Sequence, residues 1–490
     1  MTIDLFDVRI DHEGRALVDV PRLTLPPGRA VTIVGESGSG KSLLAHALMG
    51  SLPHGLRVSG EILLGNRRTP LAGTRARRRL WGRHLAMLPQ EPVLALDPTM
   101  RVHRQVAEGH PGFLRGRSGR TGALEQARHR LEDLGLAGVE RAHPHTLSGG
   151  MAQRVAFAAA TIGGAEVLIA DEPSKGLDAG SRDALARLLG RHVERGGSLL
   201  TITHDLDLAR ALSGTLLVMR RAHVVEQGPV EQVLGAPEHP WTRRLLAAEP
   251  HRWNPPWRGT DTGRKPGTTL IEGSGLTKTY GGRPVFTDVD LAIAAGERVS
   301  LSGPSGCGKT TLGGVLLRLV RPDAGSVHHH PDLAAGRAQK LYQDPSAAFA
   351  PRVPLRASLN DVVRRHRADP ARIGTLLDRL GLDPALLGRR PGEVSGGELQ
   401  RLAVIRAMLV EPRVLFADEP TSRLDLLTQE ETVHSLMDQV AEHDAALVLV
   451  THDLDLAAAV TERHVALAEK DDGADDVGPA RPARRIPAGA

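Results

Sequence analysis

Gly35-Glu36-Ser37-Gly38-Ser39-Gly40-Lys41-Ser42 is a stretch in which two glycines bracket four residues, and a lysine and a hydroxyl side chain follow. An apolar, β-branched run at 30–34 precedes it and predicts a buried strand, and an apolar run at 43–49 predicts a helix. In this setting the backbone N–H groups of the loop turn toward a phosphate, and the helix N-terminus adds partial positive charge. Lys41 is expected to reach the β- and γ-phosphates of a nucleotide, and the Ser42 hydroxyl is expected to bind Mg²⁺. The stretch therefore predicts a nucleotide site rather than a plain glycine turn.

Length and composition limit the classes of protein to which the chain can belong. At 490 residues it is expected to hold roughly two to four domains. No run approaches the roughly 18 apolar residues of a membrane-spanning helix, and no export signal is expected at the N-terminus. A single cysteine excludes a disulfide framework and favours the cytoplasm.

The charge balance gives little indication of a nucleic-acid partner. A net charge of +5 is mild for this length, although arginines cluster at 75–79. Aromatic residues make up only 2% of the chain, so a stacking platform for single-stranded nucleic acid is poorly supported. The basic cluster is interpreted as a solvated face, and no direct nucleic-acid binding is expected.

Four landmarks occur twice in the same order, which indicates a tandem duplication. The second phosphate loop starts 268 residues after the first (303 minus 35) and consists of Gly303, Pro304, Ser305, Gly306, Cys307, Gly308, Lys309 and Thr310, followed by Thr311. Each copy then has a Ser-Gly-Gly, an Asp-Glu-Pro and a Thr-His-Asp element, at 148–150 and 395–397, 171–173 and 418–420, and 203–205 and 451–453. The offset falls to 247 at the Ser-Gly-Gly element (395 minus 148), so the second copy is 21 residues shorter (268 minus 247), mostly before Gln343.

The repeat sets the expected domain boundaries. Residues 1–249 are predicted to form the first nucleotide-binding domain, 250–267 a Pro-rich irregular linker, 268–468 the second domain, and 469–490 a disordered tail.

The two copies are expected to differ in an antiparallel β region. In the first copy the stretch 58–88 predicts a small antiparallel addition to the main sheet. In the second copy it shrinks to 325–327 and a turn at His328-His329-His330. No carboxylate or cysteine pattern supports a metal site at these histidines, so a surface turn is favoured.

Two neighbouring carboxylates follow a predicted central strand in each copy. Asp171 and Asp418 each end an apolar run that is typical of a parallel strand buried on both faces. A carboxylate at that edge faces the crevice in which α/β sheets bind ligands, and it is predicted to hold Mg²⁺ opposite the loop hydroxyl, which is Thr310 in the second copy. Glu172 and Glu419 come next and are expected to polarise a water in line with the γ-phosphate.

A histidine and a glutamine also recur at strand ends. His204 and His452 each follow a β-branched run and are predicted to donate a hydrogen bond to the γ-phosphate. The amides of Gln90 and Gln343 are expected to contact Mg²⁺ or the attacking water, and to withdraw when their loops move. Taken singly, each would be an ordinary surface or turn residue, and it is the matching positions in both copies that favour the functional interpretation.

This ordered set resembles the ATP-binding-cassette family over nearly the whole chain, including loops at Asp178 and Asp425. The resemblance implies two tandem P-loop NTPase domains of the α/β class, each with a RecA-like parallel-sheet core, an antiparallel β subdomain and a helical subdomain. It also implies ATP and Mg²⁺ as cofactors, and head-to-tail pairing of the two cassettes within the chain. Each ATP would lie between one copy's phosphate loop and the other's signature element, which is Ser148, Gly149 and Gly150 for the Lys309 site and Ser395, Gly396 and Gly397 for the Lys41 site.

Two departures from the family pattern are visible. The fifth signature residue is usually Gln but is Met151 and Glu398 here, and both are expected to be tolerated because that side chain is not a phosphate ligand. The adenine-stacking aromatic of the family matches Tyr280, 23 residues before its loop (303 minus 280), whereas the same spacing in the first copy reaches His12 (35 minus 23). The first site is therefore expected to hold adenine less firmly, although both sites are predicted to hydrolyse ATP.

A segment after the first cassette narrows the resemblance. Residues 233–246, which contain His239-Pro240-Trp241-Thr242, resemble a segment of the di/oligopeptide and nickel importer ATPases, here with two ATPases fused. This implies an energy-coupling ATPase, peripheral to the cell membrane on its cytoplasmic face. Its partners would be two transmembrane permease subunits, with an extracytoplasmic solute-binding protein as an indirect partner.

Two alternatives stay open. A soluble tandem cassette protein acting on ribosomes or nucleic acid typically has a long, charged helical linker, and the Pro-rich joint at 250–267 counts against it. A fused ATPase of another importer class, such as sugar or vitamin and cobalt uptake, is disfavoured by the segment at 239–242. The transported substrate does not follow from this chain, because the permeases and the binding protein carry the selectivity.

Overall fold

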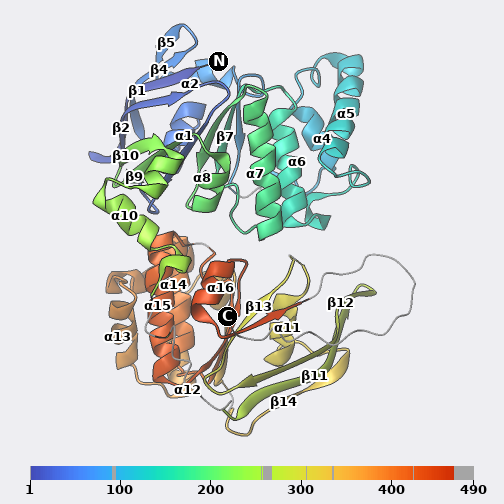
Figure 1. Cartoon of the computed structure of the whole chain (residues 1–490), viewed down its shortest axis with the longest axis vertical. Helices are drawn as coiled ribbons and strands as arrows, with labels where there is room; N and C mark the ends of the chain where they lie inside the picture. The colour runs from blue at the N-terminus through green and yellow to red at the C-terminus, as the bar shows by residue number, and fades with distance from the viewer. Residues whose placement is uncertain are drawn as a thin grey trace.

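The computed structural model describes residues 2–90, 95–254, 257, 267–304, 306–333, 336–422 and 424–467. Ser305, most of the predicted linker at 250–267 and the predicted disordered tail at 469–490 lie outside the described residues. Two stacked lobes are visible in Figure 1, formed by what we call the first half (2–254) and the second half (267–467).

The first half is built on one ten-stranded sheet in the order β5-β4-β1-β2-β10-β9-β3-β8-β7-β6. Its strands are β1 (Ile3–His12), β2 (Arg15–Leu25), β3 (Ala30–Gly35), β4 (Arg57–Leu64), β5 (Arg67–Pro70), β6 (Leu85–Leu88), β7 (Val167–Asp171), β8 (Ser198–Ile202), β9 (Thr215–Arg220) and β10 (His223–Pro229). Strands β3, β8 and β7 are buried along their whole length and pair in parallel, as apolar runs covered on both faces do. Strands β1, β2, β4 and β5 pair antiparallel at the other edge, which confirms the predicted antiparallel addition for β4 and β5. The end of the predicted stretch 58–88 differs, because β6 pairs in parallel with β7 at the opposite edge.

Helices cover this sheet and form a separate layer beyond β6. They are α1 (Lys41–Met49), α2 (Thr74–Arg78), α4 (Val102–Glu108), α5 (Gly116–Asp133), α6 (Gly149–Thr161), α7 (Ala179–Glu194), α8 (Leu206–Leu212), α9 (Val230–Gly235) and α10 (Pro240–Ala247), with 3-10 turns at Pro144–Thr146 and Pro250–Arg252. We call α4, α5 and α6 the first helical layer. Its buried alanines and leucines share one apolar cluster with α7 and the strands β6–β8.

The second half repeats this plan with two sheets instead of one. A three-stranded antiparallel sheet has the order β12-β11-β14, and a five-stranded parallel sheet has the order β15-β16-β17-β13-β18. The strands are β11 (Thr269–Tyr280), β12 (Arg283–Ala294), β13 (Arg298–Ser302), β14 (Ala324–His329), β15 (Ala338–Leu341), β16 (Val414–Asp418), β17 (Ala446–Val450) and β18 (Arg463–Ala466). In the first half β10 pairs with both β9 and β2, and so joins the parallel strands to the antiparallel strands in one sheet. The described residues of the second half contain no counterpart of β10.

One expectation about the second half is wrong. His328 and His329 were expected in a turn, but both lie in β14 and pair with Glu272 and Ile271 of β11. The alternating exposure of β14 explains the difference, because an edge strand with polar side chains on its outer face resembles a turn in composition. The Nε2 of His329 lies 2.7 Å from the Leu316 carbonyl oxygen.

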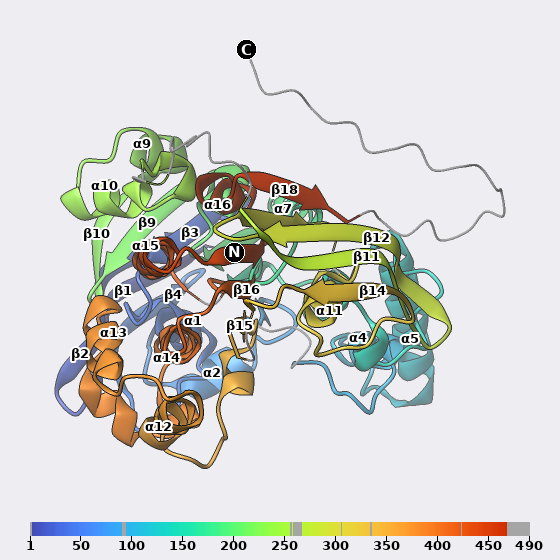
Figure 2. The same ribbon diagram turned by 90° about the horizontal axis from the view of Figure 1, so that it is seen from below.

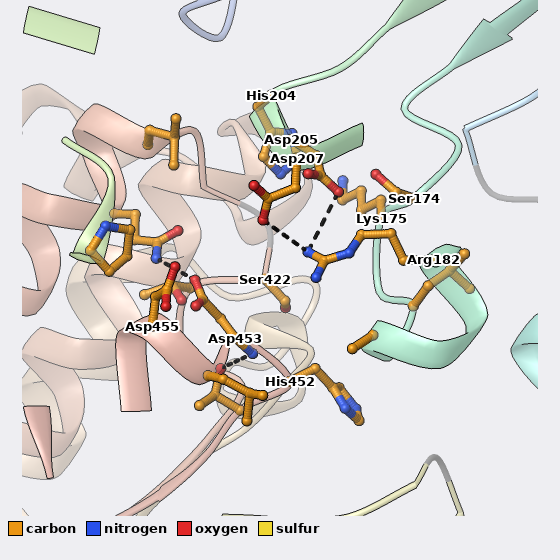
Figure 3. Close-up of a pocket in the computed structure, with 18 of the residues that line it drawn as sticks. Ser174, Lys175, Arg182, His204, Asp205, Asp207, Ser422, His452, Asp453 and Asp455 are labelled. Carbon is orange, nitrogen blue, oxygen red and sulfur yellow. Dashed lines mark hydrogen bonds and ion pairs between the residues drawn. The ribbon is translucent and has the colours of Figure 1, made fainter. Parts of the chain in front are cut away.

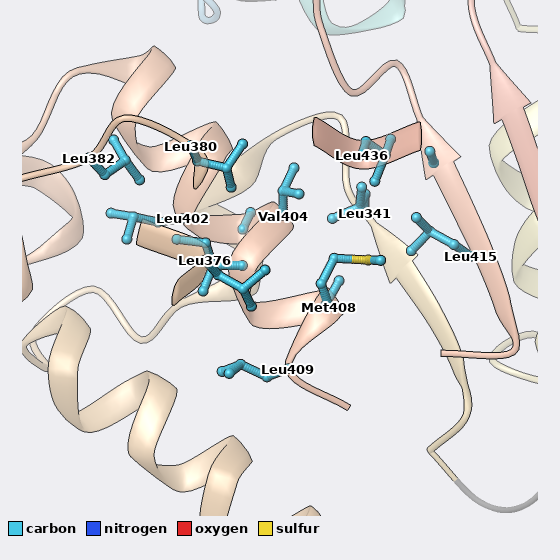
Figure 4. Packing of buried hydrophobic residues seen from close by; sticks show 14 of the residues in the cluster. Leu341, Leu376, Leu380, Leu382, Leu402, Val404, Met408, Leu409, Leu415 and Leu436 are labelled. Atoms are coloured by element: carbon cyan, nitrogen blue, oxygen red, sulfur yellow. The ribbon is translucent and has the colours of Figure 1, made fainter. Parts of the chain in front are cut away.

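The helices of the second half include its own helical layer. They are α11 (Lys309–Leu316), α12 (Leu355–His366), α13 (Ala371–Arg379), α14 (Gly396–Met408), α15 (Leu426–Glu442) and α16 (Leu454–Val460), with 3-10 turns at Pro345–Ala348, Pro384–Gly388 and Pro391–Glu393. We call α12, α13 and α14 the second helical layer. Figure 4 shows Met408 of α14 between Leu376 of α13 and Leu341 and Leu415 of the sheet, with Leu402 of α14 on the other side of Leu376, near Leu382. Across the described residues, no helix is long and apolar enough to cross a membrane.

The two halves lie head to tail. In Figures 1 and 2 the antiparallel strands β11, β12 and β14 lie at the same end as α4 and α5. At the opposite end, β1 and β2 lie over the second helical layer. This arrangement brings the phosphate loop of each half toward the other half.

The segment after β10 contacts both halves. Helix α10 starts at Pro240, and the His239 side chain caps it by accepting from the Trp241 N–H at 3.1 Å. The centre of the Trp241 ring lies 3.9 Å from the guanidinium carbon of Arg220. From the same helix, Arg244 forms an ion pair of 2.6 Å with Glu430 of α15. The segment singled out by its His-Pro-Trp-Thr residues thus links the first half to α15 of the second half.

The described part of the predicted linker contacts the second half. It begins with the 3-10 turn at Pro250–Arg252, and Trp253 is buried against the second half. The rings of Trp253 and Trp257 lie edge-on to His434 of α15, at 5.2 and 5.0 Å between ring centres. The Trp257 Nε1–H also donates to the Ala459 carbonyl at 3.2 Å. The two indoles thus attach this segment to the second half, because each combines a large apolar ring with a single hydrogen-bond donor.

Candidate nucleotide-binding sites

The first phosphate loop joins β3 to α1, as predicted. Gly40 has φ 96°, and a Cβ there would lie 2.2 Å from the Leu17 carbonyl oxygen, so this position requires glycine. The Lys41 Nζ donates to the carbonyl oxygens of Gly35 at 2.8 Å and Glu36 at 2.7 Å. The lysine therefore stands inside the loop with its charge directed at the space that the loop encloses.

The first pair of carboxylates lies opposite this loop. Asp171, at the end of β7, accepts a hydrogen bond of 3.1 Å from the Ser42 hydroxyl. Glu172 follows with φ 46°, a conformation that is uncommon for a residue other than glycine, and its N–H donates to the Ile202 carbonyl at 2.8 Å. This sharp turn brings Glu172 Oε2 to 2.8 Å from Nδ1 of His204.

Burial and charge act in opposite directions on these groups. Burial raises the pKa of Asp171 in spite of the hydrogen bond from Ser42. Burial also acts to raise the pKa of Glu172, but the positive charges of His204 and Lys41 outweigh it, and the pKa is lowered. For His204, burial acts to lower the pKa and the charge of Glu172 outweighs that effect, so the pKa is raised. Both shifts favour a carboxylate–imidazolium pair.

The second phosphate loop has the same form. The Lys309 Nζ donates to the carbonyl oxygens of Gly303 at 2.8 Å and Pro304 at 2.9 Å, and it lies 3.9 Å from the buried sulfur of Cys307. The helix α11 begins at Lys309, after Gly308 with φ 97°. The two loops thus share one backbone design.

The carboxylates of the second half differ from those of the first in one respect. Glu419 also has φ 46°, and its Oε1 lies 2.9 Å from Nε2 of His452. Asp418, however, forms an ion pair of 3.4 Å with the Nζ of Lys340 on the neighbouring strand β15. Within the described residues, no hydrogen bond joins Thr310 to Asp418. Lys340 was not predicted as a site residue, although an alignment of the two copies on their glutamines places it opposite Met87.

The two glutamines are placed differently. The Gln343 side-chain amide donates to Glu419 Oε2 at 2.7 Å, so it belongs to the second carboxylate cluster. Gln90 is exposed at the end of its strand, and no hydrogen bond joins it to another of the described residues. Their contact with Mg²⁺ or the attacking water stays a prediction.

Each Ser-Gly-Gly element starts a helix. The Ser148 hydroxyl caps α6 by accepting from the Met151 N–H at 3.3 Å, and the Ser395 hydroxyl caps α14 by accepting from the Glu398 N–H at 3.3 Å. Glu398 returns a bond, since its carboxylate accepts from the Ser395 N–H at 2.8 Å. This reciprocal cap explains why Glu fits at the fifth signature position. The glycines of each element occupy the first helical turn, where backbone N–H groups have no partner within the helix.

Contacts between the halves bring these elements toward the opposite loops. The Ser37 N–H in the first loop donates to Asp425 Oδ2 at 2.9 Å, and Asp425 also caps α15. On the other side, Pro304 of the second loop lines the same cavity as Ser148 and Gly150. The Ser148 element thus lies beside the second phosphate loop, and the first loop contacts Asp425, while completion of the Lys41 site by Ser395, Gly396 and Gly397 stays a prediction.

The two predicted adenine positions occupy equivalent places. His12 ends β1 opposite Arg15 of β2, and Tyr280 ends β11 opposite Arg283 of β12. Both side chains are exposed, and the Lys278 Nζ lies 5.3 Å from the centre of the Tyr280 ring. An aromatic platform is thus available at one site and an imidazole at the other.

A family model described as "ABC transporter" matches residues 18–175 and 286–422, one match in each half. The chain belongs to the ABC transporter family. It binds ATP, and it is an ATPase that couples ATP hydrolysis to transport. Each match includes a phosphate loop, a Ser-Gly-Gly element and an Asp-Glu-Pro element.

Named relatives match along almost the whole chain. The peptidoglycan transport ATP-binding protein YejF of Agrobacterium fabrum is 36% identical, over 92% of this chain and 87% of that protein. The glutathione import ATP-binding protein GsiA of Salmonella typhi is 32% identical, over 94% of this chain and 84% of that protein. GsiA of Escherichia coli K12 is also 32% identical, over 92% of this chain.

Solved structures share the fold of this tandem ABC transporter ATPase. The RNase-L inhibitor superposes with a TM-score of 0.65 at 24% identity, over 94% of this chain and 87% of that chain. The archaeal ribosome recycling factor aABCE1, in complex with the ribosomal stalk protein aP1, gives a TM-score of 0.63 at 23% identity. At this identity the likeness concerns the fold alone.

A cavity of about 370 Å³ lies between the two cassettes (Figure 3). On the first-cassette side, Arg182 of α7 forms ion pairs of 3.8 Å with Asp205 and 3.9 Å with Asp207. On the second-cassette side lie Asp453 and Asp455, and burial raises the pKa of Asp453. Arg182 was not predicted from the sequence, although it lies in the first turn of α7, four residues after Asp178.

Proposed function

We propose that this chain is the ATPase subunit of an importer for di- or oligopeptides or related compounds that contain peptide bonds. The supporting observation is its similarity, over more than nine-tenths of its length, to ATP-binding proteins named for peptidoglycan transport and glutathione import. Glutathione is a peptide, and peptidoglycan carries peptide stems. Nickel or metal chelates, the other predicted cargo, have no such support among these relatives.

The proposed subunit has two cassettes, at 1–249 and 268–468, joined by 250–267 and followed by a tail at 469–490. The chain binds two permease subunits at the cytoplasmic face of the membrane, and an extracytoplasmic protein delivers the solute to them. ATP binding draws the cassettes together and hydrolysis releases them, which is a two-state switch biased by nucleotide.

Two composite sites carry the chemistry in this proposal. The phosphate loops at Lys41 and Lys309 bind the phosphates, and the Ser-Gly-Gly element of the opposite cassette completes each site. Glu172 and Glu419 orient the attacking water, and each is held by its histidine at 2.8 and 2.9 Å.

A divalent cation fits the first site. The Ser42 hydroxyl and the Asp171 carboxylate lie 3.1 Å apart beside the loop, and they are hard oxygen donors of the kind that Mg²⁺ prefers. Mg²⁺ held there neutralises charge on the β- and γ-phosphates when bound. The protein's own contribution is to hold these oxygens and the lysine in place before the nucleotide arrives.

Purification of the tagged chain from detergent-solubilised membranes tests the proposed partners. Permease subunits are expected to co-purify in stoichiometric amounts, and peptides are expected to stimulate the ATPase rate of the complex with its binding protein. Ribosomal subunits in place of permeases would overturn the proposal in favour of a soluble tandem cassette factor.

The composite sites are tested by a matched pair of loop variants. Lys41→Ala and Lys309→Ala are each expected to remove one of two nucleotide sites, because each lysine belongs to only one loop. Equilibrium binding of a fluorescent ATP analogue measures the number of sites. Complete loss of binding in either single variant would contradict two separate sites.

A further inference from the structure

The two cassettes differ at one half-buried position beside the proposed metal site. Met87 of β6 pairs in register with Ile169, two residues before Asp171. Lys340 of β15 pairs in register with Phe416, two residues before Asp418. The two side chains therefore hold equivalent places in the fold, and one is neutral while the other carries a positive charge.

Lys340 is held tightly at this position. Its Nζ lies 3.4 Å from Asp418 Oδ2, and the two side chains are only 9% and 3% exposed. The Nζ also lies 5.4 Å from the centre of the Tyr342 ring and 5.5 Å from that of Phe416. A carboxylate and two aromatic faces thus surround the ammonium group, and such surroundings stabilise a cation that is removed from water.

The first cassette has a different arrangement. Asp171 accepts the Ser42 hydroxyl at 3.1 Å, and the strand beside it contributes the uncharged Met87. A divalent cation that binds between Ser42 and Asp171 meets no positive side chain from β6. At Asp418 the same cation meets the ammonium of Lys340.

We propose that Lys340 occupies the cation position of the second site, so that Mg²⁺ binds there much more weakly than at the first site. This inference rests on the proposed function, because it takes Asp171 and Asp418 as the metal-binding carboxylates. Two positive groups compete for one buried carboxylate. The lysine is already held there by the fold, whereas the metal ion must lose part of its hydration shell to bind. The second site then retains nucleotide with little dependence on Mg²⁺, and the first site carries most metal-dependent turnover.

Mn²⁺ binding to the full-length chain tests this directly. Free Mn²⁺ is measured by electron paramagnetic resonance in the presence of a non-hydrolysable ATP analogue. The native chain is expected to show one tight Mn²⁺ site and a second that is weaker by at least about tenfold. Asp171→Asn is expected to remove the tight site, and Asp418→Asn the weak one, which assigns them.

Lys340→Met gives the second cassette the methionine that the first cassette has at the equivalent position, Met87. It is expected to tighten the weak site by at least about tenfold and to leave the tight site unchanged. The reciprocal variant Met87→Lys is expected to weaken the tight site. Lys340→Gln provides a second test if the Met variant does not fold, with circular dichroism as the check on folding.

The outcomes separate the inference from the function on which it rests. Two equally tight Mn²⁺ sites in the native chain, unchanged by Lys340→Met and Lys340→Gln, would overturn the inference alone. Absence of nucleotide-dependent Mn²⁺ binding in every variant would overturn the proposed sites and the inference with them.

Discussion

The backbone N–H of Ser37 donates to the carboxylate of Asp425 at 2.9 Å, across 388 residues of sequence. Ser37 lies in the first phosphate loop, and Asp425 caps helix α15 of the other cassette through the Thr428 N–H at 3.0 Å. Burial acts to raise the pKa of Asp425, but the hydrogen bonds from Thr428 and Ser37 outweigh it, so the carboxyl stays ionised. One carboxylate therefore links the position of a phosphate loop to the start of a helix in the opposite cassette.

Removal of this link is expected to weaken both the helix and the contact between cassettes. Asp425→Ala loses the cap and the bond to Ser37, and it is expected to lower the free energy of unfolding by about 0.5–2 kcal/mol. Asp425→Asn keeps a capping oxygen, so its stability should stay closer to that of the native chain. Denaturant unfolding measures both, and equal losses in the two variants would contradict the capping role.

Replacement of the two glutamates tests the proposed general bases. Glu172→Gln and Glu419→Gln keep the size of the side chain and remove its charge, so each is expected to lower the rate of ATP hydrolysis. The double variant should lose about 10²–10⁴-fold, the usual contribution of a general base. Phosphate release at saturating ATP and Mg²⁺ measures the rates. Unchanged hydrolysis in both single variants would contradict the assignment.

Limiting Mg²⁺ separates the two sites further. If Lys340 competes with the metal at Asp418, Glu172→Gln should reduce the rate more than Glu419→Gln at low Mg²⁺. Steady-state rates measured over a range of Mg²⁺ concentrations provide the comparison. In Lys340→Met the difference between the two glutamine variants should shrink, and a difference that persists unaltered would count against the competition.

The ion pair of Glu172 and His204 makes the free energy of unfolding depend on pH, and the pKa shifts of the two groups give the sign of that dependence. The raised pKa of His204 means that its part of the stabilisation is present at low pH and is lost as pH rises through that value. The lowered pKa of Glu172 means that its part is lost as pH falls through that value. The pair is thus strongest between the two pKa values.

Nuclear magnetic resonance titration of His204 checks this. Its pKa is expected to lie above the ordinary histidine value of about 6.5, and Glu172→Gln should lower it. Glu419→Gln is the matched control, because it removes the corresponding charge from the other cassette and should leave His204 unaffected. An unmoved His204 in Glu172→Gln would contradict the pairing.

The adenine positions lead to opposite expectations for two substitutions. Tyr280→Ala should weaken ATP binding at the Lys309 site by about 1–3 kcal/mol, because base stacking on an aromatic ring is lost. His12→Tyr should strengthen binding at the Lys41 site, since it installs the ring that the second cassette already has. Titration with a fluorescent ATP analogue in the Lys41→Ala or Lys309→Ala background isolates each site. Equal affinities in His12→Tyr and the native chain would exclude stacking at that position.

Much of the fold was predictable because its signals are local and occur twice. The run at 30–34 with its glycine loop predicted β3 and α1, and the apolar runs before Asp171 and Asp418 predicted the buried strands β7 and β16. The prediction failed where a short polar segment has no pattern of its own, as at His328 and His329, whose strand forms only by pairing with β11.

The sequence by itself determined the order of loop, helix and strand end, because motif spacing sets it, and it predicts which residues meet a nucleotide. Only the tertiary structure decided which of them meet one another. Ser37 with Asp425, Lys340 with Asp418, and Gln343 with Glu419 are contacts between residues 388, 78 and 76 positions apart (425 minus 37, 418 minus 340, 419 minus 343). Such pairs depend on strand register and on the docking of two halves, which no local pattern encodes.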